Sequence, residues 1–191
     1  MGEKKRCAWS VSDPVYIVYH DREWGVPVRD DRRQFEFLVL ESAQAGLSWL
    51  TILKRREGYT RLYKGFDPEQ VVNFDEARIQ SMLQDAGIIR NRKKIESSIN
   101  NARRFLEVKE QYGSFCNYLW GFTDGLQLVN HFRYLSEIPA TTSLSDTIAK
   151  DMKKRGFQFL GSTIIYAHLQ ATGLVNDHLV DCFRHKECIE R

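Results

Sequence analysis

Several widespread functional motifs are absent from this chain of 191 residues. Neither Gly-x-Gly-x-x-Gly nor Gly-x4-Gly-Lys-[Ser/Thr] occurs, which argues against kinases, ATPases and dehydrogenases. A serine nucleophile elbow and a Cys-x-x-Cys pair are also missing. No apolar run approaches the roughly 20 residues that span a bilayer, so the sequence predicts no membrane role.

Cysteine is scarce, and the excess of positive over negative residues is small. The four cysteines, at positions 7, 116, 182 and 188, have no close pairing pattern, and the opening Met-Gly-Glu-Lys-Lys-Arg lacks the apolar region of a signal peptide. Both observations predict a cytoplasmic protein with reduced thiols. Lys plus Arg number 28 against 25 for Asp plus Glu, so the net charge of +3 is only a weak indication of an anionic partner.

Strand signals are few, so the sequence predicts an all-α protein of many short helices in one domain over residues 1–191. Residues 7–24 are expected to form an aromatic-rich loop region, and residues 126–140 an extended connector between two lobes. Side chains that can accept hydrogen bonds from free backbone amides predict where helices begin. These candidate N-caps are Asp30 or Asp31, Ser48, Asp67, Asp75, Ser114 and Ser143.

Glu41 follows the apolar run Phe37-Leu38-Val39-Leu40, where periodicity predicts burial. An ionised, unpaired carboxylate in an apolar site costs several kcal/mol or more, so Glu41 should be hydrogen-bonded or have a raised pKa. Either condition suits a ligand pocket. A structural pairing with an Arg, or a helix cap, is the alternative.

Six side chains with aromatic or ligand-binding character lie among residues 7–24: Cys7, Trp9, Tyr16, Tyr19, His20 and Trp24. Such aromatics either fill a core or form the wall of a pocket for a flat ligand.

Two turns carry clustered cations. Lys153, Lys154 and Arg155 precede a turn over residues 156–161, and Ser162 and Thr163 then begin a helix whose free amides suit a phosphate. The segment from Gly87 to Lys94 adds four cations at a second turn. Two basic hairpins favour a role in nucleic-acid binding over a basic surface that is only exposed to solvent. An ordinary helical hairpin remains the alternative.

Cys7, His20, His178 and Cys182 form a Cys2His2 set that could bind zinc tetrahedrally. The spacing of His178 and Cys182 would bring both to one point on a helical turn. The overall spacing matches no common zinc finger, so two buried cysteines and two unrelated histidines are the alternative; His185 and Cys188 are further candidates.

With these residues in view, the chain resembles the bacterial 3-methyladenine DNA glycosylase I family, a branch of the helix-hairpin-helix glycosylases, over nearly its whole length. The resembling stretches are Cys7-Ala8-Trp9, the run from Asp13-Pro14 to Val26-Pro27, the run from Glu41 to Trp49, Asp85-Ala86-Gly87-Ile88-Ile89-Arg90, Lys154-Arg155-Gly156-Phe157 and the run from Gly173 to His178.

This resemblance implies a two-lobed helix-hairpin-helix fold, with the hairpin near residues 144–173. It implies one structural Zn²⁺, bound by Cys7, His20, His178 and Cys182, that joins residues 7–20 to residues 178–182. It also implies a pocket for a flipped 3-methyladenine, with Glu41 as the catalytic carboxylate and with Trp9, Tyr16, Tyr19 and Trp49 around the base. Asp177 is expected mainly to hold the zinc-site helix in place.

The expected partner is double-stranded DNA that contains 3-methyladenine, and the expected state is a monomer. We expect Gln44, Gly46 and Leu47 to enter the duplex, and Lys154, Arg155, Gly161, Ser162 and Thr163 to contact its backbone. Because no lysine is placed in the pocket to form a Schiff base, we expect hydrolysis without strand cleavage. The main rival is a non-enzymatic, zinc-stabilised DNA-binding module; a zinc hydrolase would need an open metal position.

Overall fold

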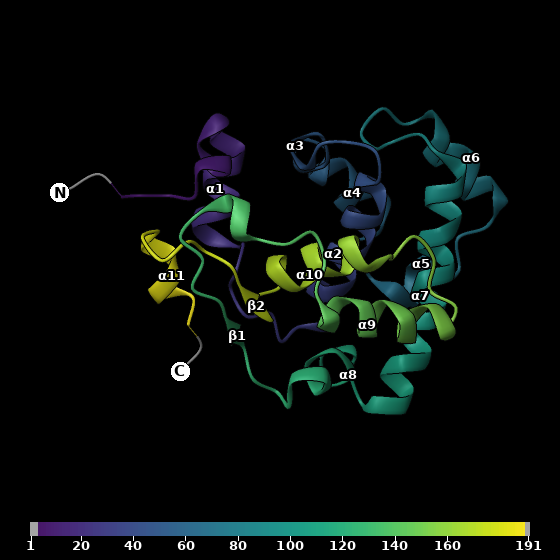
Figure 1. The fold of residues 1–191 in the computed structure, drawn as a ribbon. Coiled ribbons are helices and arrows are strands. Elements are labelled where there is room, and N and C mark those ends of the chain that lie inside the picture. The colour runs from purple at the N-terminus through teal and green to yellow at the C-terminus, as the bar shows by residue number, and fades with distance from the viewer. Residues whose placement is uncertain (1–3, 190–191) are drawn as a thin grey trace.

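A computed structural model of the chain describes residues 4–189. Residues 1–3 and 190–191 lie outside the described residues, and so does the first half of the Met1 to Arg6 segment that lacks the apolar region of a signal peptide. The structure is mainly helical, as predicted (Figure 1). In chain order the elements are η1 (Ala8–Ser12), α1 (Pro14–Arg22), α2 (Asp31–Gln44), α3 (Trp49–Leu53), α4 (Arg56–Leu62), α5 (Pro68–Val71), α6 (Glu76–Gln84), α7 (Arg92–Tyr112), α8 (Phe115–Trp120), η2 (Gly121–Thr123), β1 (Leu128–Val129), η3 (Leu135–Glu137), α9 (Ser143–Lys154), α10 (Ser162–Ala171), β2 (Val175–Asn176) and α11 (Phe183–Glu187).

Most of the predicted N-caps are confirmed by hydrogen bonds. The side chains of Asp30, Ser48, Asp67, Asp75 and Ser114 each accept from a backbone amide in the first turn that follows. Such caps satisfy amides that have no partner inside the helix.

Two local predictions at helix starts need correction. The helix at 143 is capped by Thr142, whose hydroxyl accepts from Ser145 N while Ser145 Oγ accepts from Thr142 N. Asp31 does not cap its own helix; its carboxylate accepts from Phe115 N and Cys116 N and so caps α8 from a distance.

Residues 7–24 are not a loop region, because η1 and α1 occupy most of them. Asp13 caps α1 and Pro14 occupies its first turn, where a missing amide hydrogen costs nothing, so this pair begins a helix. The predicted connector, residues 126–140, contributes β1, which pairs in parallel with β2.

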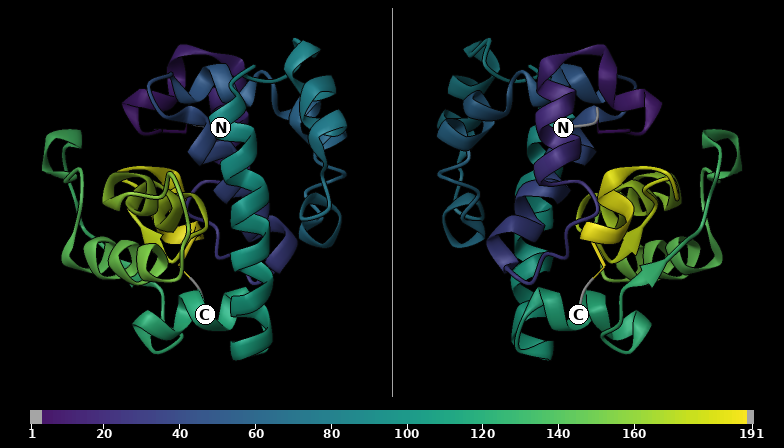
Figure 2. Two further views of the ribbon diagram at one scale, coloured as in Figure 1. Left: turned by 90° about the vertical axis from the view of Figure 1, so that its right-hand side faces the viewer. Right: turned by 90° about the vertical axis from the view of Figure 1, so that its left-hand side faces the viewer.

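The larger hydrophobic core surrounds α2, which is buried along almost its whole length, from Gln34 to Ala43. Helix α7 packs along α2, α5, α6 and α8 and spans most of the height of the molecule in the views of Figure 2. The burial of α2 explains its continuous apolar sequence, since a helix that is covered on all sides needs no solvated face.

A smaller core joins the two ends of the described chain. It contains Cys7, Tyr19, Trp24, Leu179 and Cys182 among its buried members. Helices α1 and α11 lie on the same side of the molecule (Figure 1), and Phe183 N donates to the carbonyl of Lys5.

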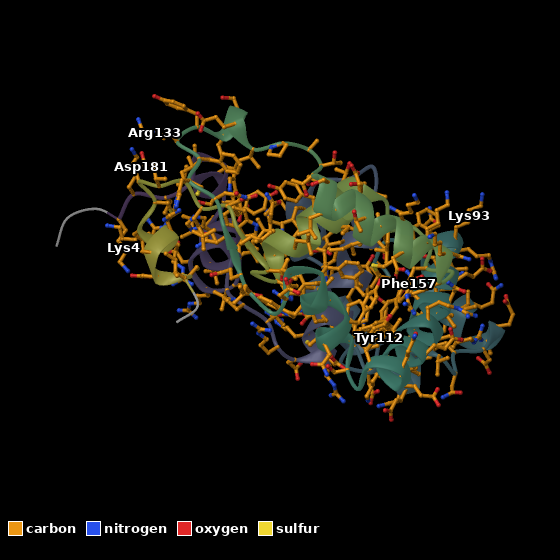
Figure 3. The ribbon with its side chains drawn as sticks, turned by 60° about the horizontal axis from the view of Figure 1, so that its bottom comes forward. Lys4, Lys93, Tyr112, Arg133, Phe157 and Asp181 are labelled. Atoms are coloured by element: carbon orange, nitrogen blue, oxygen red, sulfur yellow. The ribbon has the colours of Figure 1, made fainter. Side chains whose placement is uncertain are left out.

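Helices α9 and α10 form a hairpin that packs closely and is fastened to α7. The Asn101 side chain donates to Gln158 O and accepts from Gln158 N, and Asn100 donates to Gly156 O. Phe157 and Lys93 lie toward one end of the molecule, and Lys4 and Asp181 toward the other (Figure 3). Within residues 4–189, no helix combines the length and the apolarity that a membrane crossing requires.

Candidate functional site

A cavity of about 360 Å³ opens between α1, α2, α3 and α10. All five residues predicted to surround a ligand line it: Glu41, Trp9, Tyr16, Tyr19 and Trp49. The remaining lining residues are Trp24, Gln44, Leu135, Ile138, Ala167, Gln170 and Ala171.

The aromatic side chains of the cavity pack against one another in edge-to-face and tilted pairs. Trp9 packs against Tyr16 and Trp24 with ring centroids 5.6 and 5.1 Å apart, and Tyr19 packs against Trp49 at 5.6 Å. The Tyr16 hydroxyl accepts from Leu50 N at 2.9 Å, which ties α1 to the start of α3. The walls are therefore rigid, flat and mostly apolar, as stacking on a planar ligand requires.

Glu41 is buried at the base of the cavity. Its Oε2 lies 2.8 Å from His168 Nδ1, and His168 Nε2 lies 2.8 Å from Gln34 Oε1. Burial raises the pKa of Glu41, and the charge and hydrogen bond of His168 oppose that rise. Burial also raises the pKa of Tyr19 well above its usual value, and the negative charge of Glu41 adds to this effect.

Two polar atoms of the cavity are buried and have no hydrogen-bond partner among residues 4–189. They are Glu41 Oε1, an acceptor, and Trp49 Nε1, a donor that lies near the Tyr19 hydroxyl without the geometry of a hydrogen bond. A buried unpaired polar atom costs about 1–3 kcal/mol, so such atoms at a cavity wall point to a ligand that supplies a donor and an acceptor.

The segment after α2 carries the residues expected to enter the duplex. Gly46 has φ +79°, and Leu47 is 40% exposed. Gln44 and Leu47 also line a smaller cavity of about 210 Å³, whose other side includes Thr163. Lys94 Nζ donates to the carbonyls of Ala43 and Ala45, both at 2.8 Å, and so fastens the C-terminal end of α2 to α7.

The structure gives different surroundings to the residues expected to contact the DNA backbone. Gly161 is the N-cap residue of α10 and has no side chain to occupy the free amides. Ser162 Oγ lies 2.8 Å from Ser145 Oγ. Arg155 pairs with Asp151 and donates to Gln111 and Tyr112, whereas Lys154 is exposed at the end of α9.

At the second basic turn, two of the four cations have structural partners. Arg92 pairs with Glu76 and Glu96, and Lys94 holds α2 as described. Arg90 and Lys93 are the other two.

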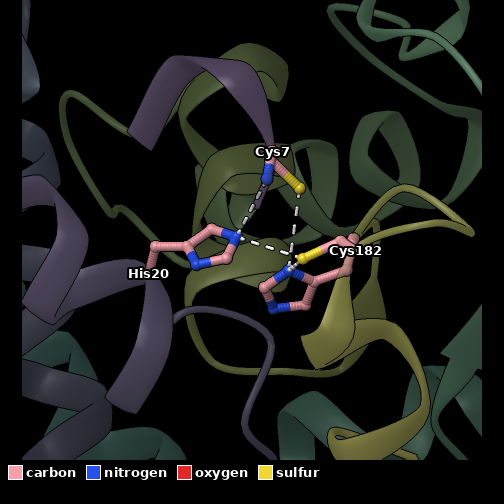
Figure 4. A group of neighbouring side chains, drawn as sticks. Cys7, His20 and Cys182 are labelled. Carbon is pink, nitrogen blue, oxygen red and sulfur yellow. Dashed lines mark hydrogen bonds between the residues drawn. The ribbon is translucent and has the colours of Figure 1, made fainter. Parts of the chain in front are cut away.

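Cys7, His20, His178 and Cys182 meet in one buried cluster, whose four ligand atoms lie within 4.8 Å of one another (Figure 4). Cys182 Sγ lies 3.4 Å from His20 Nε2 and 3.6 Å from His178 Nδ1, and Cys7 Sγ lies 3.8 Å from His178 Nδ1. Bonds of about 2.0 Å to nitrogen and 2.3 Å to sulfur place the ligands of tetrahedral zinc about 3.3–3.8 Å apart. These residues could therefore hold a metal ion.

The outer nitrogens of both histidines are also occupied. His20 Nδ1 lies 2.8 Å from Asp21 Oδ1, and His178 Nε2 lies 2.9 Å from the Trp24 carbonyl. These bonds direct the proton of each ring outward and a lone pair toward the cluster, as in metal-ligating histidines. A hydrogen bond with Cys7 lowers the pKa of Cys182, so the cluster favours a thiolate.

The prediction that His178 and Cys182 meet on a helical turn is wrong. Residues 177–182 form no helical turn; the loop after β2 brings the two side chains together instead. His185 and Cys188 do not belong to the cluster: His185 Nε2 bonds to Asn130 O, and Cys188 Sγ lies 3.9 Å from Trp24 O. Asp177 is fully buried and accepts from Asn130, Tyr166 and Gln170.

Several residues of the site were not identified from the sequence. His168 and Gln34 are individual polar residues on helices α10 and α2, and neither belongs to a motif that would mark it. The packing of α10 on α2 brings His168 to both Gln34 and Glu41. Leu135 and Ile138 come from the connector and reach the cavity through its path across the molecule. Gln170 lies one helical turn after Ala167, so both residues of α10 line the cavity from one face of this helix.

Comparison with known proteins gives consistent matches. Residues 9–185 match the family described as methyladenine glycosylase. The chain is 48% identical over 178 residues to DNA-3-methyladenine glycosylase 1 of Escherichia coli strain K12, covering 93% of this chain and 95% of that protein.

Two solved structures are also similar. One, on 3-methyladenine recognition by the 3-methyladenine DNA glycosylase I of Staphylococcus aureus, superposes with a TM-score of 0.91 at 37% identity, covering 95% of this chain and 97% of that one. The other is a tyrosine-to-phenylalanine variant of 3-methyladenine DNA glycosylase I in complex with 3-methyladenine, with a TM-score of 0.90 at 37% identity and coverages of 93% and 96%.

Proposed function

Because the chain belongs to the methyladenine glycosylase family, we propose that it is a DNA repair enzyme that extrudes 3-methyladenine from alkylated duplex DNA and hydrolyses the bond from that base to its sugar. The observation that carries the proposal is the pair of unpaired polar atoms in an aromatic cavity. The Hoogsteen edge of adenine presents an amino donor beside the N7 acceptor, which complements Glu41 Oε1 and Trp49 Nε1.

Methylation at N3 makes the base cationic while it is attached to DNA, and the cavity suits that charge. Stacking of a cation on Trp9, Tyr16 or Trp49 contributes about 0.5–2 kcal/mol. Glu41 supplies the electron-rich, unpaired oxygen Oε1 nearby. Undamaged adenine is neutral and gains less from both interactions.

A cationic base is already a good leaving group, so catalysis rests on extrusion, stacking and electrostatics. As the glycosidic bond lengthens, the sugar gains oxocarbenium character, which the Glu41 carboxylate and the DNA phosphates stabilise before water adds. Among the residues that line the cavity there is no lysine, so a Schiff base does not form and the strand stays intact.

We assign DNA binding to the surfaces around the cavity mouth. Gln44, Gly46 and Leu47 fill the space left by the base, and the α9–α10 pair acts as the helix-hairpin-helix, with Gly161, Ser162 and Thr163 at a backbone phosphate. Lys154 adds charge there, while Arg155 mainly holds the hairpin against α7 and α8.

The Cys7, His20, His178 and Cys182 cluster is assigned to one structural Zn²⁺. Its donor set and spacing fit tetrahedral coordination, and four protein ligands leave no position for a reacting water, which argues against a zinc hydrolase. We further propose that the protein is a cytoplasmic monomer with one glycosylase domain.

The proposal is tested by incubating the protein with methylated duplex DNA and identifying the released bases by chromatography. Release of 3-methyladenine is expected, with abasic sites left uncleaved. Glu41→Gln should lower the rate roughly 100-fold or more, since it replaces the carboxyl group that lines the cavity with an amide. DNA binding without release above a buffer control would instead support the non-enzymatic DNA-binding module.

A further inference from the structure

Glu41 belongs to a chain of hydrogen bonds that base release alone does not explain. His168 on α10 and Gln34 on α2 continue the chain away from the cavity, with both links at 2.8 Å. Glu41 is 2% exposed, and the other two side chains are fully buried. The links of this buried network are satisfied except at Glu41 Oε1, which lines the cavity.

The far end of the chain determines the direction of its hydrogen bonds. The Val28 carbonyl can only accept, so Gln34 directs its Nε2 toward it, at 3.0 Å. Gln34 Oε1 then faces His168 Nε2 and can only accept as well. His168 must therefore carry a hydrogen on Nε2.

The near end of the chain then requires one more proton. With Nε2 protonated, the 2.8 Å contact of His168 Nδ1 with Glu41 Oε2 needs a hydrogen between the two atoms. The proton lies on nitrogen as an imidazolium or on oxygen as a carboxylic acid, and in both cases the pair is neutral overall. Without it, two lone pairs would face each other in a buried site.

We propose that His168, oriented by Gln34, is a positioning residue that keeps this shared proton on the Oε2 side of Glu41, so that Oε1 remains a hydrogen-bond acceptor toward the base. The inference rests on the proposed function, because it assumes that Oε1 receives the amino group of the damaged base. Without His168, burial would favour a protonated Glu41 whose hydrogen could occupy Oε1 and oppose that amino group.

The other charged and titratable groups around the pair have partners of their own. Tyr19 faces Glu41 from α1, with Glu23 and Arg56 behind it. Lys94 of α7 binds the carbonyls at the end of α2, and Asp177 beside α10 accepts from three side chains. On α9, Asp151 is bound by Tyr118 and Arg155.

The test measures 3-methyladenine release from methylated DNA across about pH 5.5 to 8 with three variants. His168→Phe keeps the ring and removes both nitrogens, and release should fall about tenfold at neutral pH. The loss should deepen as the pH falls, because an unpaired Glu41 is neutralised at higher pH than the paired one. His168→Asn keeps a donor toward Glu41, so its rate of release should stay within about threefold of that of the unmodified enzyme. The pH profile of His168→Asn should also match that of the unmodified enzyme.

Thr172→Val is the matched control, since the Thr172 hydroxyl bonds to the His168 carbonyl and not to the ring. It should leave the pH profile unchanged. A constant ratio of His168→Phe to unmodified rates across the pH range would overturn the inference, whereas no release by the unmodified enzyme would overturn the proposed function.

A second measurement uses the unmodified protein, so it does not depend on whether the variants fold. Nitrogen-15 NMR of histidine-labelled protein should show His168 Nε2 bonded to hydrogen throughout this pH range. An unprotonated Nε2 would contradict the deduced direction of the hydrogen bonds.

Discussion

Trp49 offers the cavity both a flat apolar face and a buried indole N–H, which lies near the Tyr19 hydroxyl but forms no regular hydrogen bond in the described chain. These two properties have different chemical roles, because stacking attracts any planar cation while the N–H selects a base with an acceptor in the right place. At the scale of single residues, recognition is therefore divided between shape and hydrogen bonding.

Trp49→Phe separates the two contributions. It retains an aromatic face and removes the donor, so we expect the dissociation constant for 3-methyladenine to rise about tenfold, the effect of one hydrogen bond. Titration calorimetry with the free base measures this change. Trp49→Ala removes both contributions and should weaken binding further; equal effects from the two variants would show that the indole N–H is not used.

The sequence predicted the members of the site better than the contacts between them. Glu41 was correctly expected to be buried and hydrogen-bonded, because an apolar run is a local property. The partners of Glu41 were not predicted, because His168 lies far along the chain and reaches Glu41 only through the packing of α10 on α2. Charge and hydrogen-bond direction at a buried site depend on such distant neighbours.

At the scale of elements, the end of α2 connects the cavity to the Gln44 to Leu47 segment, which we propose enters the duplex. Glu41 lies in the last turns of this helix, and the Gln44 to Leu47 segment follows it. The last carbonyls of a helix have no internal partners, and Lys94 supplies two hydrogen bonds to them from α7.

Lys94→Met should loosen this helix end while keeping most of the apolar stem. We expect release from duplex DNA to fall roughly three- to tenfold, since one or two hydrogen bonds of about 1 kcal/mol are lost, with a smaller effect on binding of the free base. Lys109→Met on the same helix, paired only with exposed Glu69, is the control and should change neither quantity. An equal loss in free-base binding would place the defect in the cavity and not in the segment.

Helix starts were the most predictable elements, as the side chains of Asp30, Ser48, Asp67, Asp75 and Ser114 illustrate. A cap is set by neighbouring residues, so sequence is sufficient. The loop that carries His178 and Cys182 was predicted incorrectly as a helical turn, because its course depends on the pairing of β2 with β1 and on the cluster itself.

At the scale of the whole molecule, the cluster of Cys7, His20, His178 and Cys182 shares a wall with the cavity. Trp9 packs against His20, and Trp24 packs against His178, with ring centroids 5.5 and 4.5 Å apart. Both tryptophans also line the cavity. The cluster therefore supports the aromatic wall on which the base would stack.

Cys182→Ser should remove the bound metal and lower the melting temperature by roughly 10 °C or more, because several kcal/mol of folding free energy depend on the site. Metal analysis and thermal unfolding measure both effects, and one zinc per chain is expected in the unmodified protein. Cys188→Ser changes a buried thiol nearby that is not a ligand, and it should retain the metal. Equal stability of the Cys182 variant, without metal in either protein, would disprove a structural zinc.

Cys7 and Cys182 stand near opposite ends of the described chain, so an ion held between them would close nearly all of it into a ring. A protein pulled by its two ends in an optical trap would then carry tension only through the short outer segments and the coordination bonds. The helices between them would remain unloaded until the first ligand detached. Unfolding under force should therefore begin at the metal, with a rupture force that chelation abolishes.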